Sequence, residues 1–209
     1  MGGKSMSVSS KPGFFGTITD SQSYLNVIYL LLALPLGIFY FAFLVTGLSL
    51  GIGLSITLAG IPILLVVLAG SLVLGRLERI LAKKLLRVDI PTPPRRAASP
   101  GFWSRFKALL SDRLVWKDTL YLLFKFPIGI ATFTLAVTLL AVSIGFVFAP
   151  AYMWMSDPLV WGGRVYSAYP WAWILTAVGI PIAFGSLRLM NAVAAGLGGM
   201  TRYMLGKAK

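Results

Sequence analysis

The side chains that most often carry out chemistry in proteins are scarce in this sequence. Its 209 residues contain no histidine, no cysteine and only six acids. Without histidine and cysteine the chain lacks the usual ligands of zinc, haem and iron–sulfur clusters, and the usual catalytic dyads. We therefore expect no enzyme and no bound cofactor. The acids are Asp20, Glu78, Asp89, Asp112, Asp118 and Asp157.

Two of these acids have a structural interpretation. Asp112 and Asp118 are spaced so that they cannot face one another on one helix. A negative charge is favourable near the start of a helix, where the backbone dipole is positive. We expect both residues to cap or charge helix starts.

A second group of candidates lies between residues 149 and 170, where aromatic side chains are dense. Asp157 and Arg164 are the charged residues of this segment, and they could pair with each other or engage a charged ligand. The segment predicts either a ligand or partner site, or an aromatic belt at the level of the lipid headgroups. The candidate site residues are Tyr152, Trp154, Asp157, Trp161, Arg164 and Tyr166.

The elements that must position these residues are strongly apolar. Hydrophobic residues make up 57% of the chain and charged residues 12%, and the mean hydropathy is +0.84. A soluble domain carries about twice this charged fraction, roughly 25%. The apolar runs are long and continuous rather than alternating, which predicts membrane-spanning helices and not barrel strands.

We expect an all-α membrane protein with four transmembrane helices. The glycine-rich stretch 47–53 predicts a tight hairpin between the first two spans, although Gly47 and Gly51 could instead bring two helices close together. The predicted order is an N-terminal tail at 1–23, a four-span domain at 24–190 and a C-terminal tail at 191–209. Within the domain, the spans are expected at 24–45, 52–74, 126–148 and 171–187, with an inner loop at 75–125 and an outer loop at 149–170.

The distribution of basic residues predicts the orientation. Of the 19 lysines and arginines, only Arg164 falls between the third and fourth spans. Cytoplasmic loops carry the excess of such residues, so both termini and the inner loop are expected in the cytoplasm. The net charge of +13 is then a sign of topology and not of nucleic-acid binding.

The inner loop contains two amphipathic segments, Arg76–Val88 and Phe102–Trp116, and the tail 188–209 is similar. We expect them to lie as cytoplasmic interfacial helices against an anionic leaflet. Lys125 is expected to extend to the interface, and a transporter is least supported because the spans carry no charge. The candidate lipid-contact residues are Arg79, Lys83, Lys84, Arg87, Arg95 and Arg96.

The sequence repeats itself. YLLLALPLGI at 29–38 matches YLLFKFPIGI at 121–130, and GIPI at 60–63 recurs at 179–182. We expect two parallel two-span repeats related by an axis along the membrane normal. Proline and glycine in these motifs predict kinks used for packing, or a hinge. The candidate positions are Pro35, Gly37, Pro62, Pro127, Gly129 and Pro181.

These motifs carry a family resemblance. SDRLVWKD at 111–118, the following YLLFKFPIG, and the LPLGIFYF, GIPIL and LERILAKKLL stretches of the first half resemble the "putative sensor" domain. That domain occurs mainly in actinobacteria and archaea, before histidine kinases and in stand-alone membrane proteins. The resemblance covers about Leu25 to Met190. It implies a four-span input module of a prokaryotic plasma membrane, whose output comes from a separate protein unless the domain has become a structural subunit.

The leading hypothesis is therefore a non-enzymatic, sensor-like membrane module that acts through helix packing and partner contacts. An accessory subunit of a respiratory or photosynthetic complex is the second hypothesis, and a small-solute transporter is the third. The expected partners are anionic lipids of the inner leaflet and other membrane or cytoplasmic proteins, and no nucleic acid.

Overall fold

In a computed structural model of the protein, the structure describes residues 20–88, 101–155, 159–161, 164–166 and 169–206. Within these ranges the chain is helical apart from a short antiparallel ribbon. The elements in order are α2 (Ser21–Gly53), η1 (Leu54–Thr57), α3 (Gly60–Leu85), α4 (Phe102–Leu110), α5 (Arg113–Val147), α6 (Ala149–Met155), β1 (Leu159–Trp161), β2 (Arg164–Tyr166) and α7 (Tyr169–Gly206).

Helices α2, α3, α5 and α7 are each long and apolar enough to cross a membrane. This confirms the predicted class of an all-α protein with four transmembrane helices. The 35 residues of α5 and the 38 of α7 exceed the roughly 20 needed to cross the hydrocarbon, so these helices must tilt or extend beyond it.

The connection between the first two helices differs from the prediction. Gly47 and Gly51 lie inside α2, and the chain turns at η1 and closes with Leu58 in the left-handed region, at φ 60°. Side chains on the two glycines would collide with Val67 and Leu64 of α3. The glycines therefore bring α2 and α3 together and do not form the turn.

The segments predicted as interfacial helices are mostly continuations of the long helices. Helix α3 runs unbroken from Gly60 to Leu85, and α7 runs to Gly206. The predicted helix 102–116 is divided, because Asp112 caps α5 by accepting a hydrogen bond from the Leu114 amide. The cap predicted at Asp112 is thus confirmed.

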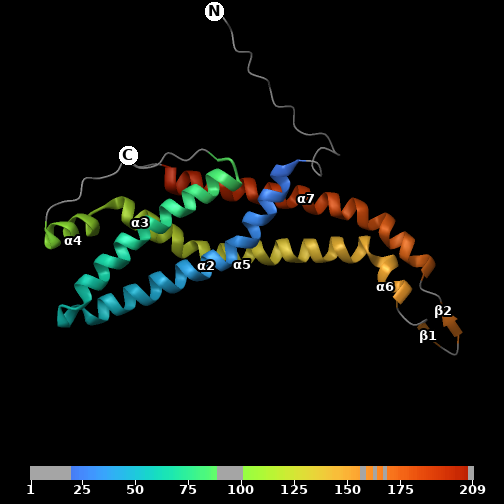
Figure 1. The fold of residues 1–209 in the computed structure, drawn as a ribbon, viewed down its shortest axis with the longest axis horizontal. Helices are drawn as coiled ribbons and strands as arrows, with labels where there is room; N and C mark the ends of the chain where they lie inside the picture. Colours follow the sequence, from blue (N-terminus) through green and yellow to red (C-terminus); the bar gives the residue numbers. More distant parts are fainter. Residues whose placement is uncertain (1–19, 89–100, 156–158, 162–163, 167–168, 207–209) are drawn as a thin grey trace, which may run out of the picture.

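The four long helices form two hairpins that diverge. Helices α2 and α3 lead to η1 at one end of the long axis of the molecule, whereas α5 and α7 lead to α6 and the strands at the other end (Figure 1). Between these ends the helices overlap and cross (Figure 1). We call residues 21–85 the first half and residues 113–206 the second half.

The two halves bury the same positions. Counting from Tyr29 in α2 and from Tyr121 in α5, every buried position of α2 coincides with a buried position of α5. Counting from Gly60 in α3 and from Gly179 in α7, the buried positions also coincide, except that buried Leu68 corresponds to half-buried Leu187. The repeat seen in the sequence is therefore also a shared pattern of packing.

Helices α2 and α5 cross at equivalent glycines. A Cβ atom on Gly37 would lie 3.1 Å from the carbonyl oxygen of Lys125, and one on Gly129 would lie 2.6 Å from that of Ala33. Ala33 and Lys125 are themselves equivalent positions, so the contact is reciprocal, as a two-fold axis requires. Glycine is needed at both positions because the two backbones touch.

The prolines do not interrupt the helices. Pro35, Pro127 and Pro181 lie inside α2, α5 and α7, which continue through them. Pro62 lies in the first turn of α3, where a missing amide hydrogen is tolerated. Their role as hinges stays a prediction.

Candidate functional site

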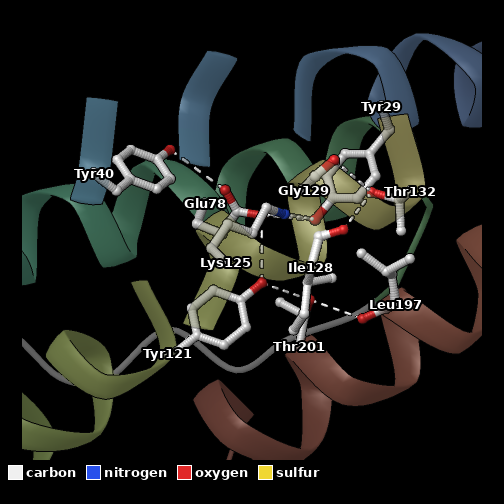
Figure 2. A network of polar contacts seen from close by, with 10 residues as sticks. All are labelled: Tyr29, Tyr40, Glu78, Tyr121, Lys125, Ile128, Gly129, Thr132, Leu197 and Thr201. Atoms are coloured by element: carbon white, nitrogen blue, oxygen red, sulfur yellow. Dashed lines mark hydrogen bonds and ion pairs between the residues drawn. The ribbon is translucent and has the colours of Figure 1, made fainter. Parts of the chain in front are cut away.

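A buried carboxylate and a buried ammonium group meet where the helices overlap. The Lys125 Nζ of α5 lies 2.5 Å from Glu78 Oε1 of α3, and their side chains are 2% and 0% exposed. Lys125 also donates a hydrogen bond to the hydroxyl of Tyr29 at 2.6 Å, and Tyr29 donates to Glu78 Oε1 at 2.6 Å. The three side chains form a closed triangle (Figure 2).

Further hydroxyl groups surround this triangle. Tyr40 donates to the second oxygen of Glu78 at 3.3 Å, and Tyr121 donates to the first at 3.4 Å. The Tyr121 hydroxyl lies 2.8 Å from that of Thr201 in α7, and Thr201 donates to the carbonyl of Leu197 (Figure 2). Side chains from all four long helices thus meet in one network, which we call the ionic cluster: Tyr29, Tyr40, Glu78, Tyr121, Lys125 and Thr201.

The residue that follows Glu78 forms a second buried ion pair. Arg79 binds Asp118 of α5 with two parallel hydrogen bonds, at 2.7 Å and 3.1 Å. Both side chains are at most 1% exposed. This two-pronged geometry is the strong form of an arginine–carboxylate contact. Gly75 leaves room for it, because a Cβ atom there would lie 2.5 Å from Asp118 Oδ2.

A third contact joins α2 to α7 through hydrogen bonds between uncharged side chains. Asn26 donates to Asn191 at 2.9 Å, and Asn191 donates to Ser23 at 2.8 Å. Asn26 occupies the position in α2 that Asp118 occupies in α5. Both positions therefore hold a polar side chain that reaches the other half.

The ionic cluster is suited to coupling helices. Glu78 and Lys125 neutralise each other, and each has further hydrogen-bond partners, as buried ions require. The Lys125 Nζ also lies 4.4 Å from the centre of the Tyr29 ring, a favourable cation–π distance. Because removing one partner of a buried pair costs about 3–5 kcal/mol, the positions of α3 and α5 depend strongly on each other.

Comparison with protein families identifies the chain. The family model described as "Putative sensor" matches residues 29–205. The chain belongs to this family. The match spans both halves and every residue of the ionic cluster. Searches of the curated proteins and of the solved structures found no match.

The predicted outer-loop site of this sensor-family protein is only partly described. Tyr152 lies on α6 with 59% of its surface exposed, and Trp161 pairs with Arg164 across the ribbon, with Tyr166 opposite Leu159. Trp154 lies in α6, and Asp157 falls outside the described residues. An apolar hollow of about 310 Å³ adjoins Tyr152, and its lining residues are Val142, Gly145, Phe146, Ala149, Tyr152, Met153 and Leu175.

The predicted lipid-contact residues separate into three groups. Lys83, Lys84 and Arg87 are exposed, as lipid contact would require. Arg79 is 2% exposed and bound to Asp118, so its assignment to the lipid surface was wrong. Arg95 and Arg96 fall outside the described residues.

The amphipathic pattern of Arg76–Val88 was also misinterpreted. Leu77 and Ile80 are 44% and 51% exposed, whereas the neighbouring Glu78 and Arg79 are buried. Glu78 and Arg79 turn inward because their partners lie on α5. The other basic residues, Lys83, Lys84 and Arg87, stay exposed, and Leu81, Leu85 and Val88 pack against the core.

Sequence reasoning missed the ionic cluster. Lys125 was expected at the interface and Asp118 at a helix start, but both point into the bundle. Helices α3 and α5 extend past the predicted spans, and these extensions carry the buried charges. One signal was available. In the aligned repeats Lys125 stands opposite Ala33, and the only glutamate of the chain lies in the other half.

Proposed function

We propose that this sensor-family protein is a non-enzymatic input module that acts through the packing of its helices and through contacts with a separate signalling protein. The observation that carries the proposal is the ionic cluster, which ties α2, α3, α5 and α7 together at one place. A displacement of one helix alters contacts made by the other three.

The burial of the cluster supports coupling over catalysis. Glu78 is fully buried and Lys125 is 2% exposed, so a substrate in solution does not reach them. Ion pairs inside membrane helices are costly and usually serve a function. Transmission of a conformational change between helices is the use that this sealed arrangement favours.

The proposed orientation follows from charge. Residues 38–75 and 130–156 contain no lysine, arginine, aspartate or glutamate, whereas basic residues follow Gly75 in α3 and begin at Arg188 in α7. We place the region where the helices overlap, which holds the ionic cluster, toward the cytoplasm of a prokaryotic cell, with both termini on that side.

The orientation is tested with single cysteines, because the chain has none of its own. An impermeant thiol reagent added to whole cells should label Ile56→Cys, and it should label Lys84→Cys and Arg95→Cys only after permeabilisation. Labelling of Arg95→Cys in intact cells would overturn the orientation.

The sensor function is tested by transcript profiles. A chromosomal Glu78→Leu/Lys125→Ala variant and a deletion should change an overlapping set of transcripts, and the variant should do so at unchanged membrane abundance. Gly145→Ala is the matched control, since a Cβ atom there meets nothing within 4 Å.

Purification in mild detergent separates this function from the structural alternative. A sensor should co-purify with a cytoplasmic signalling protein. A fixed stoichiometry with a large membrane complex, together with an unaltered transcript profile in the deletion strain, would make the chain an accessory subunit and overturn the proposal.

A further inference from the structure

The described polar contacts that join the two halves lie on one side of the α2–α5 crossing. Lys125 binds Glu78, Asp118 binds Arg79, and Asn191 binds Asn26. In α2 and α5 these residues all precede Gly37 and Gly129, the glycines of the crossing. We call the three contacts the polar clasp.

Beyond the crossing, the described hydrogen bonds lie within a half, although apolar side chains still pack across: Phe41 stacks on Phe126, and Ala136 packs in one cluster with Tyr29. We define residues 38–75 as the first arm and residues 130–187 as the second arm. In the first arm, a Cβ atom on Gly70 would lie 2.6 Å from the Phe43 ring, which shows how closely α3 approaches α2. In the second arm, Ser143 donates to Ser186 at 3.1 Å and Thr176 donates to the carbonyl of Phe146 at 3.4 Å.

The ends of the arms are far apart. The turn at η1 and the connection through α6 and the strands lie at opposite ends of the long axis (Figure 1). Each arm is thus a two-helix hairpin whose described polar contacts lie within it, apart from the hydrogen bond from Tyr40 to Glu78.

We propose that the two arms change their separation by rotating about the Gly37–Gly129 crossing, and that the polar clasp sets their resting position. The crossing suits a pivot because backbone meets backbone at both glycines. Beside them the flat rings of Phe41 and Phe126 are stacked. The crossing adjoins the clasp through Lys125, whose carbonyl oxygen lies against Gly37 while its side chain binds Glu78.

The length of the arms amplifies such a rotation. Helix α2 continues to Gly53 beyond the pivot, about 24 Å at 1.5 Å per residue, so a rotation of roughly 10° moves η1 by about 4 Å. A small displacement at the polar clasp would become a large displacement at the ends of the arms. A large displacement at the ends of the arms would likewise become a small one at the clasp. Motions of this kind occur in microseconds to milliseconds.

Spin-label distances test the proposal in the full chain, reconstituted in lipid nanodiscs. Labels on Ile56→Cys and Ile174→Cys report between the arms, at positions that are 93% and 55% exposed. Pairs within an arm are the controls: Ile52 with Val66 in the first, and Ile144 with Ile174 in the second. We expect a broader distance distribution between the arms than within either arm.

Loosening the clasp should move only the distance between the arms. In the Glu78→Leu/Lys125→Ala variant, we expect this distribution to shift and broaden while both distributions within the arms stay unchanged. Gly37→Ala acts at the pivot itself, where the new methyl group lies 3.0 Å from Phe126 Cα, and it should shift the same distance.

The opposite result is equally clear. If the distribution between the arms is as narrow as those within them, and does not move in either variant, the molecule is one rigid body and the proposal is wrong. Should a variant alter the distances within an arm, its fold has changed, and the widths in the unsubstituted chain then decide. A rigid molecule would leave the transcript test of the sensor function standing.

Discussion

The two halves of this sensor-family protein share one packing pattern but bury different groups at one pair of equivalent positions. In α3 and α5 the positions hold Glu78 and Lys125, whereas their counterparts in α7 and α2 are Leu197 and Ala33. All four residues are buried. The same helical scaffold therefore accepts an ion pair at one site and apolar side chains at the other.

This difference separates packing from function. The apolar site shows that the scaffold does not need charge in order to pack. Replacement of a buried ion pair by well-packed apolar residues is often neutral or stabilising. The Glu78–Lys125 pair is therefore better explained by coupling between particular helices than by stability.

The comparison is tested most strongly by giving the ionic site the composition of its counterpart. Glu78→Leu or Lys125→Ala alone leaves a buried charge without a partner, which should lower the free energy of unfolding by about 3–5 kcal/mol. The double variant, which reproduces the Ala33/Leu197 composition, should lose less than either single variant. Reversible unfolding in mixed micelles measures all three. Equal losses that simply add in the double variant would contradict the equivalence of the two sites.

The crossing glycines should show a smaller, graded effect. Valine at Gly129 or Gly37 forces the backbones apart, and such overpacking costs about 1–3 kcal/mol. The loss should be larger at Gly129, where a Cβ atom would lie 2.6 Å from a carbonyl oxygen, against 3.0 Å for the nearest atom at Gly37. Gly145→Ala, in open space, should not destabilise the protein in the same assay.

Two equivalent tyrosines sharpen the comparison further. Tyr29→Phe removes an acceptor of Lys125 and a donor to Glu78, both at 2.6 Å, and hydrogen bonds to charged groups contribute about 1.5–3 kcal/mol. Tyr121→Phe mainly removes the contact with the Thr201 hydroxyl, a neutral bond that contributes about 0.5–1.5 kcal/mol. The same unfolding assay should therefore show a larger loss of stability for Tyr29→Phe than for Tyr121→Phe. The reverse order would contradict the prediction that Tyr29 makes the stronger contacts with the ion pair.

The smallest effect on stability is expected in the outer loop, where the second half has an insertion that the first lacks. Because the sequence predicts that this loop lies outside the four spans, we expect Trp161→Ala and Asp157→Asn to change stability by less than about 0.5 kcal/mol. They should nevertheless alter the transcript response if the loop receives the input. Loss of the protein from the membrane after either change would make the loop structural.

Much of the fold could be predicted because hydrophobicity is a local property of the sequence. Long uncharged runs identify spanning helices, and the PLG and PIG motifs identify the repeat. The turn was misplaced because glycine is compatible with two structures: Gly47 and Gly51 fit a turn as well as a close contact with α3.

The site could not be predicted because it depends on which helices meet. Leu77 and Ile80 alternate with charged residues in a way that suits an interfacial helix, and only the partners on α5 account for the burial of Glu78 and Arg79. Lys125 could extend to water if Glu78 were not opposite it. Local sequence contains neither fact.

The adjacency of Glu78 and Arg79 has a consequence for the order of assembly during synthesis. Their partners, Lys125 and Asp118, lie 47 and 39 residues later in the chain. When the first hairpin leaves the ribosome, it carries the adjacent charges of Glu78 and Arg79 before their partner residues have been synthesised. The two neighbouring charges offset each other, so Glu78 and Arg79 add no net charge to the basic end of the unfinished hairpin until α5 supplies their partners.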